Sequence, residues 1–299
     1  MWHSLAASSV SAIVSRAATY PADTIKARLQ LQGALQGPLA YRSTLHAVRQ
    51  ALAAEGAAGL YRGFAAVLAG VLPANALYYA TYELLKGHLP GPLGGAAVGA
   101  AAQMVAGVAF TPTDIIKERL QVAPLMGGTY RYRSAWHALK ALLREHGMRG
   151  LFKGYWLTNS VWIPWSMLYV AAYEESKRRL TAHLHGADPA AVDGSGCGER
   201  EAGACALPAW GYAASSAGSA ATAALATQPL DVVKTRLQVL SAGKGGGALT
   251  AWSVARSLFR REGLRGFAGG NAARVAQLAA GAAVSWVTYE EAKLRLAGL

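Results

Sequence analysis

A pattern of opposite charges occurs three times along the chain. This proline motif reads Pro-x-Asp-x-x-Lys-x-Arg-Leu-Gln and begins at Pro21, Pro112 and Pro229. The aspartate and lysine of each copy stand three residues apart, so they share one face of a helix. Charges of this kind are costly beside hydrocarbon and must pair or face water. The three copies can therefore close a ring of ion pairs, formed by Asp23, Lys26, Asp114, Lys117, Asp231 and Lys234.

A second charge pattern follows each proline motif later in the chain. This tyrosine motif reads Tyr-Glu-x-x-Lys and begins at Tyr82, Tyr173 and Tyr289. Its acid and base are again three residues apart, so they too share one helix face. The three copies supply a second set of six charges: Glu83, Lys86, Glu174, Lys177, Glu290 and Lys293.

The elements that position these motifs are predicted from composition. The 299 residues are 53% hydrophobic and 15% charged, against about 25% charged in typical soluble domains. Six runs lack Asp, Glu, Lys and Arg, and they predict six membrane-spanning helices. These runs are 1–15, 64–82, 87–113, 154–173, 202–230 and 275–289. The first and last are long enough only if Arg16 and Arg274 lie within their helices.

The distribution of charge between these runs predicts an orientation. The segments 31–62, 121–153 and 239–270 carry fourteen basic residues against three acidic ones. The positive-inside bias places these three segments on one side of the membrane. Both termini then lie on the opposite side, because the number of spans is even.

The two motifs and their threefold repetition resemble the mitochondrial carrier family over essentially the whole chain. The resemblance implies an all-α membrane protein with six transmembrane helices in three pseudo-threefold repeats around a central cavity, with short matrix-side helices. The repeats are expected at 1–88, 89–182 and 208–299, with an inserted loop at 183–207. It further implies a monomeric, multi-pass protein of the mitochondrial inner membrane, with both termini in the intermembrane space and a small-molecule substrate.

The resemblance also assigns partners to the charged residues. The matrix gate would pair Asp23 with Lys117, Asp114 with Lys234 and Asp231 with Lys26, braced by Gln30, Gln121 and Gln238. The cytoplasmic gate would pair Glu83 with Lys177, Glu174 with Lys293 and Glu290 with Lys86, braced by Tyr82, Tyr173 and Tyr289. Two opposed rings favour transport by alternating access over an alternative in which the pairs only hold helices together.

The substrate contacts are expected twelve residues before each tyrosine of the second motif, by analogy with the family. The count gives Gly70, Val161 and Gln277, with Trp162 and Trp165 nearby and Arg16 and Arg274 facing the same water. Two arginines without counter-ions would favour an anionic or zwitterionic substrate that bears a carboxylate, amino-acid-like or cofactor-like. The two tryptophans could stack on an aromatic ring or line an apolar pocket of the substrate site. They are equally compatible with facing lipid or a neighbouring helix.

Two glycine turns resemble the lipid-binding sites of the family. Arg62-Gly63 and Lys153-Gly154 would hold cardiolipin as a structural lipid at helix N-termini, while the third copy has Ala268 in place of the basic residue. A simple turn before a helix remains the alternative reading of these segments. No metal and no other cofactor are expected.

Other classes of function are less compatible with this sequence. Six apolar runs and the absence of binding motifs argue against a nucleic-acid-binding protein. The sequence shows no set of nucleophile and base of the kind that would indicate an enzyme. The remaining alternative is a carrier-like membrane protein with a structural or regulatory role.

Overall fold

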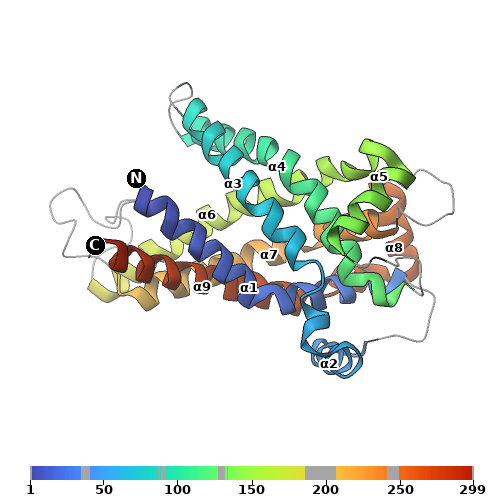
Figure 1. Ribbon diagram of the computed structural model, residues 1–299. Coiled ribbons are helices and arrows are strands. Elements are labelled where there is room, and N and C mark those ends of the chain that lie inside the picture. Colours follow the sequence, from blue (N-terminus) through green and yellow to red (C-terminus); the bar gives the residue numbers. More distant parts are fainter. Residues whose placement is uncertain are drawn as a thin grey trace. The chain divides into compact units, whose positions relative to one another are not determined.

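The fold is built from helices of two length classes. The computed structural model describes residues 2–34, 41–86, 88, 92–126, 132, 134–185, 207–240 and 249–297. Within these residues there are helices and no strand (Figure 1). Six long helices are α1 (Trp2–Leu31), α3 (Phe64–Leu85), α4 (Pro92–Val122), α6 (Tyr155–His185), α7 (Ala209–Leu240) and α9 (Asn271–Ala297). Three shorter ones are α2 (Thr44–Leu60), α5 (Ala135–Leu151) and α8 (Ala251–Gly266), with 3₁₀ turns η1 (Gln32–Ala34) and η2 (Ala123–Leu125).

The order long, short, long occurs three times, and the short helices begin in the same way. The side chains of Ser43, Ser134 and Thr250 each accept a hydrogen bond from the backbone N–H three residues further on. A serine or threonine at this position satisfies a donor that the first helical turn leaves free. Each short helix also contains one glycine with positive φ: Gly56, Gly147 and Gly263. The threefold repetition seen in the charge motifs therefore extends to the local backbone.

The proline motifs lie inside long helices rather than at their ends. Pro21, Pro112 and Pro229 are within α1, α4 and α7, and each helix continues for ten or eleven residues beyond the proline. The aspartate, lysine and glutamine of each motif consequently project from the last turns of one continuous helix.

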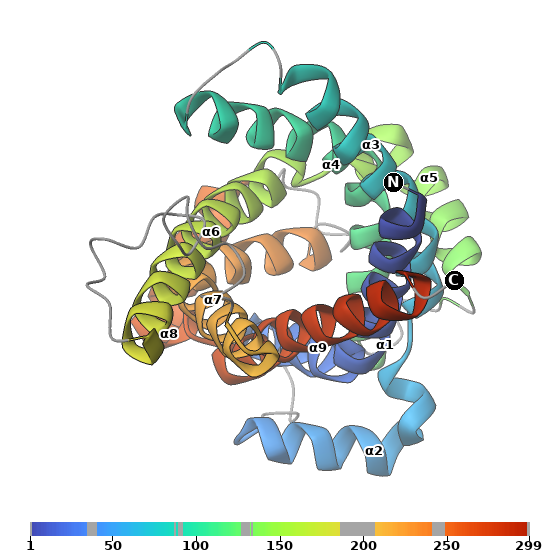
Figure 2. The same cartoon turned by 90° about the vertical axis from the view of Figure 1, so that its left-hand side faces the viewer.

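The chain divides into two compact units. The first, which we call the motif unit, comprises Tyr20–Ile163 and Thr227–Arg274. All three proline motifs have their charged residues in it, and within it α3 lies beside α4 in both views (Figures 1 and 2). The second unit comprises Met1–Thr19, Pro164–Ala226 and Val275–Leu299.

Close helix contacts in the second unit involve small residues. The Ser15 hydroxyl donates to the backbone carbonyl of Gly281 at 2.8 Å and so joins α1 to α9. The hydroxyls of Tyr169 and Ser216 lie 2.9 Å apart and join α6 to α7. Small residues allow such close approach of helix backbones in membrane proteins.

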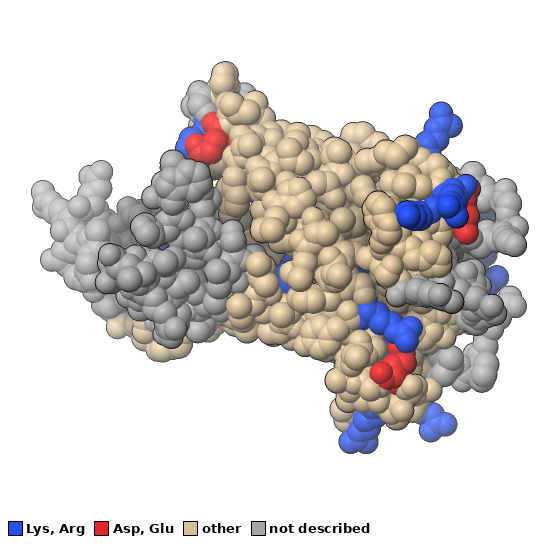
Figure 3. Space-filling model, viewed as in Figure 1, with Lys and Arg blue, Asp and Glu red and all other residues tan. Residues whose placement is uncertain are grey.

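The surface of α3 and α4 is apolar between their ends. Large apolar side chains exposed there are Leu72, Leu77, Tyr79, Leu84, Val105 and Val108. Figure 3 shows this surface largely without Lys, Arg, Asp or Glu. Among the described residues, α3 is the one helix that is long and apolar enough by mean hydropathy to cross a membrane. The sequence-based expectation of six spans rests instead on runs without Asp, Glu, Lys and Arg.

Candidate functional site

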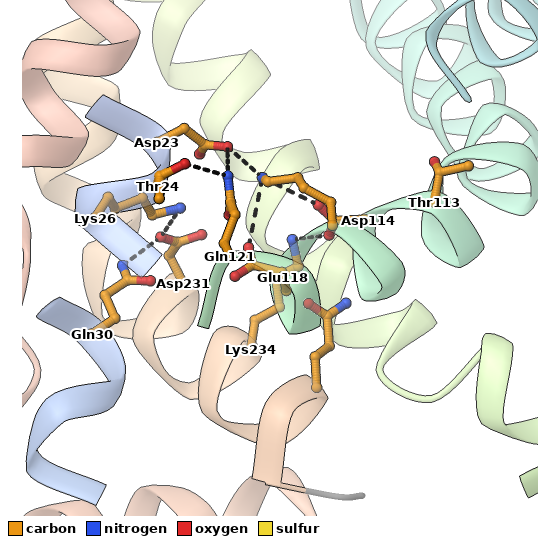
Figure 4. Close-up of polar contacts among 12 residues, drawn as sticks. Asp23, Thr24, Lys26, Gln30, Thr113, Asp114, Glu118, Gln121, Asp231 and Lys234 are labelled. Atoms are coloured by element: carbon orange, nitrogen blue, oxygen red, sulfur yellow. Dashed lines mark hydrogen bonds and ion pairs between the residues drawn. The ribbon is translucent and has the colours of Figure 1, made fainter. Parts of the chain in front are cut away.

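Three ion pairs join the ends of α1, α4 and α7 in the motif unit (Figure 4). Lys117 Nζ lies 2.7 Å from Asp23 Oδ2, Lys234 Nζ lies 2.5 Å from Asp114 Oδ2, and Lys26 Nζ lies 2.7 Å from Asp231 Oδ2. The six side chains are each at most 9% exposed. We call these six residues the proline-motif ring. Its pairs are the three that the family resemblance implies, and each pair joins two different repeats.

The glutamines of the three motifs do not behave alike. Gln30 Nε2 donates to Asp231 Oδ2 at 2.8 Å, and Gln121 Nε2 donates to Asp23 Oδ2 at 3.2 Å. Gln238 Nε2 donates instead to the hydroxyl of Thr158 on α6, at 3.3 Å. The expectation that Gln238 braces its own pair is therefore not met in this conformation. A hydroxyl acceptor on the neighbouring helix takes the amide hydrogen instead.

Arg274 differs most from the expectation. Its side chain is 2% exposed, and its Nε lies 3.4 Å from Asp231 Oδ2. It also donates to Thr227 Oγ1 at 2.8 Å and to Gln228 Oε1 at 3.2 Å. The prediction of an arginine without a counter-ion is wrong here, because α9 begins beside the proline-motif ring. Arg274 consequently adds a second cation to the Asp231 carboxylate.

An outer layer of arginine–glutamate pairs surrounds the ring. Arg28 donates to both oxygens of Glu55 at 2.7 and 3.1 Å, and Arg236 donates to both oxygens of Glu262 at 2.5 and 2.9 Å. Bidentate geometry makes these pairs strong and directional. These pairs were not predicted from the sequence, although each proline motif contains this arginine. The second repeat has His146 before its glycine, where the other two have a glutamate.

A fourth carboxylate lies within the ring. Glu118 follows Lys117 on α4, and its side chain is 2% exposed. Its Oε1 lies 3.7 Å from Lys117 Nζ, which is too long for a hydrogen bond. Its Oε2 has no hydrogen-bond partner among the described residues. Glu118 was not predicted as a site residue, because the corresponding residues of the other two motifs, Ala27 and Thr235, are not acidic.

The tyrosine motifs form a different kind of pair. Lys86 Nζ lies 2.5 Å from Glu83 at the C-terminal end of α3, and Lys177 Nζ lies 3.0 Å from Glu174 within α6. The predicted pair of Glu83 with Lys177 would join the two units. The predictions for Tyr289, Glu290 and Lys293 lie outside the described side chains. The second ring therefore remains a prediction.

Aromatic rings accompany the tyrosine motifs. Tyr82 stacks on Tyr78 with ring centroids 6.3 Å apart. On α6, Trp165 stacks on Tyr169 at 5.2 Å, and Tyr169 stacks on Tyr173 at 6.0 Å. These spacings of four residues align the three rings along one face of the helix.

The predicted substrate contacts fall into three environments. A Cβ at Gly70 would lie 2.2 Å from Thr113 Oγ1, so α3 and α4 are in close contact there, and Val161 has no exposed surface. Trp162 packs edge-to-face against Phe110, with ring centroids 6.5 Å apart. The described residues Trp165, Gln277 and Arg16 are half-buried in the second unit.

The two predicted lipid sites precede α3 and α6. Gly63 and Gly154 have φ of 85° and 87°, which favours glycine. Arg62 Nε lies 3.3 Å from Glu55 Oε2. Burial, together with the nearby Arg119 guanidinium, lowers the pKa of Lys153 below its ordinary value of 10.5. Lys153 is thus a cation that an approaching anion would stabilise.

Comparisons with known proteins agree with this architecture. A family model described as "Mitochondrial carrier protein" matches residues 1–93, 90–184 and 206–298. The mitochondrial glycine transporter of Mus musculus is 31% identical, over 96% of this chain and 82% of its own length. The mitochondrial citrate transporter C of Aspergillus niger is 32% identical, over 93% and 85%. Mitoferrin of Dictyostelium discoideum is 28% identical, over 98% and 93%.

Proposed function

Because the chain belongs to the mitochondrial carrier family, we propose that it moves a small solute across the inner membrane by alternating access between two charged gates. Transport across the mitochondrial membrane follows from the family and from its named relatives. One observation supports the gating mechanism above all: the three ion pairs of the proline-motif ring each join two different repeats. The same residues would separate when the matrix end opens.

The energetics of the ring suit a gate. Removing two charges from water offsets much of their attraction, so even a buried pair contributes only modestly to net stability. The ring can therefore be exchanged for a comparable set of pairs at the other end. Glu83 and Glu174 pair within their own helices, which leaves them able to change partners when the cytoplasmic end closes.

The proposed substrate is a solute that carries a carboxylate, either anionic or zwitterionic. Arg16 is half-buried on α1 and takes part in none of the ion pairs among the described residues. A half-buried guanidinium outside these ion pairs is well suited to bind a carboxylate of the substrate through two parallel hydrogen bonds. Two of the relatives are named for glycine and citrate, which both carry this group.

A lipid phosphate is the proposed occupant of the glycine turn before α6. The first N–H groups of a helix attract anions, and Lys153 supplies a cation beside them. Cardiolipin would thus act as a structural lipid here and, more weakly, beside Arg62, whose guanidinium already contacts Glu55. The proposal further places both termini in the intermembrane space and treats the protein as a monomer.

The test measures the melting temperature of the detergent-purified protein against a panel of carboxylates and amino acids, with and without cardiolipin. A ligand at a hundred times its Kd should stabilise the protein by about 2.7 kcal/mol. Arg16→Ala should abolish the shift, whereas Arg144→Ala, an exposed arginine of α5, should keep it. Uptake of the compound into liposomes then tests transport. A folded protein that neither responds to the panel nor transports any of its members would support a structural role instead.

A further inference from the structure

Glu118 is a buried acid that takes no part in the three ion pairs of the closed ring. Its side chain is 2% exposed, its Oε2 has no hydrogen-bond partner among the described residues, and its Oε1 lies 3.7 Å from Lys117 Nζ. A carboxylate buried in this way lowers the stability of the conformation that contains it. The other two motifs avoid this penalty with Ala27 and Thr235 at the same position.

The surroundings of Glu118 point to Lys117 as its partner. Lys117 Nζ is 2.7 Å from Asp23 on α1, but it also lies 3.7 Å from Asp114 Oδ1 and 3.7 Å from Glu118 Oε1 on its own helix. Lys26, Lys234 and Asp114 also act electrostatically on Glu118. Among the three lysines of the ring, only Lys117 has an acidic residue next to it in the sequence.

Opening the ring would change this balance. When α1 moves away from α4, Lys117 loses Asp23, its nearest carboxylate. Two acids of α4, Asp114 and Glu118, each have an oxygen 3.7 Å from Lys117 Nζ and stay on its helix when the three pairs separate. Glu118 thus gives Lys117 a second carboxylate, which the other two lysines of the ring lack on their own helices. Lys117 can reach it by side-chain rotation alone, without any movement between helices.

We propose that Glu118 is a positioning residue that receives Lys117 when the pair with Asp23 separates, and so stabilises the conformation open to the matrix. The inference rests on the proposed gating function. It explains why the chain would retain a buried acid whose Oε2 has no hydrogen-bond partner among the described residues: the acid is used in the other conformation. Removing its charge should therefore favour the closed ring, whereas removing Asp23 should favour the open one.

The test uses a buried thiol to report opening. Cys197 and Cys205 are first replaced by serine, and Thr235→Cys is introduced, because Thr235 has no exposed surface and its hydroxyl has no hydrogen-bond partner among the described residues. The rate at which N-ethylmaleimide labels this position is measured in detergent by mass spectrometry. Glu118→Gln and Glu118→Ala should slow labelling about fivefold, the equivalent of one ion pair of ~1 kcal/mol.

Matched variants separate the possible outcomes. Glu118→Asp should keep a rate near that of the parent, and so should Glu145→Gln, which alters an exposed acid on α5. If Glu118 only held the ring together, Glu118→Gln would loosen it and labelling would become faster; faster or unchanged labelling overturns the inference. Asp23→Asn tests the gate itself, since labelling should become faster. If Asp23→Asn has no effect, the gating proposal fails, and the role of Glu118 fails with it.

Discussion

The proline motifs and the tyrosine motifs have the same spacing of acid and base, yet their charges choose different partners. In the proline-motif ring, each lysine pairs with a carboxylate from another repeat and is almost completely buried. In the tyrosine motifs, Lys86 and Glu83 pair within one helix turn and remain 52% and 63% exposed. Spacing places the charges on one helix face, but the contact between helices decides which carboxylate a lysine meets.

Burial also makes the two regions unequal in energy. An exposed pair gains little, because water screens the charges and two flexible side chains must be ordered. A buried charge must keep its partner, because no water replaces it. Lys26 and Lys117 therefore depend on the arrangement of three helices, whereas Lys86 depends only on its own helix. The first of four predictions tests this difference directly, and the other three extend the comparison of buried with exposed sites to neighbouring parts of the molecule.

The largest effect is expected for the buried ring. Lys117→Ala leaves Asp23 without its nearest cation and should lower the free energy of unfolding by about 3–5 kcal/mol. Lys86→Ala, in the exposed pair, should change it by less than ~0.5 kcal/mol. Melting temperatures in detergent compare the two variants. If the two variants lost the same amount of stability, burial would not explain the difference between the proline-motif ring and the tyrosine motifs.

The outer layer of the ring should show a smaller effect. Glu262→Gln and Glu55→Gln each break a bidentate pair with a buried arginine, and each should cost about 1–3 kcal/mol. Glu145→Gln is the control in the second repeat and should cost less than ~0.5 kcal/mol, because Glu145 is exposed. Chemical denaturation or melting temperature measures both. A loss at Glu145 as large as that at Glu262 would contradict this assignment of the outer layer.

Packing between α3 and α4 gives a third comparison. Gly70→Ala would place a Cβ 2.2 Å from Thr113 Oγ1, and such overpacking should cost about 1–3 kcal/mol. At Gly99 on α4 a Cβ meets no atom within 4 Å, so Gly99→Ala should raise stability by about 0.5–1 kcal/mol. Opposite signs of the shift in melting temperature are the expected result.

The smallest effect concerns lipid and pH. The pKa of Lys153 lies below the ordinary lysine value of 10.5, so this lysine loses its proton at a lower pH than other lysines do as the pH rises. Stabilisation by cardiolipin should therefore decline by about 1 kcal/mol, the contribution of one cation, as the pH rises through the lowered pKa of Lys153. Lys153→Arg should keep the stabilisation, because arginine stays charged. A decline of equal size in Lys153→Arg would remove Lys153 as its cause.

Much of the fold could be predicted because its signals are local or repeated. Six runs without charged residues predicted the long helices, three copies of each motif predicted the repeats, and the spacing of Asp23 and Lys26 placed their side chains on one face. The partners of Arg274 could not be predicted in this way. Its partner, Asp231, lies on α7, far from Arg274 in the sequence. An arginine that was expected to lack a counter-ion is therefore buried in an ion pair.

The sequence by itself determined the repeats, the helices and the residue types that can form a ring. It did so because helical periodicity and motif spacing act within a few turns of one helix. Only the tertiary structure decided that Gln238 donates to Thr158 and that Glu118 is buried, with its Oε2 unpartnered among the described residues. These outcomes depend on helices that are distant in the sequence, as in the bond between Gln30 and Asp231, 201 residues apart. A charged side chain that loses water at such a contact needs a partner from another helix, and spacing along the sequence does not determine which partner it meets.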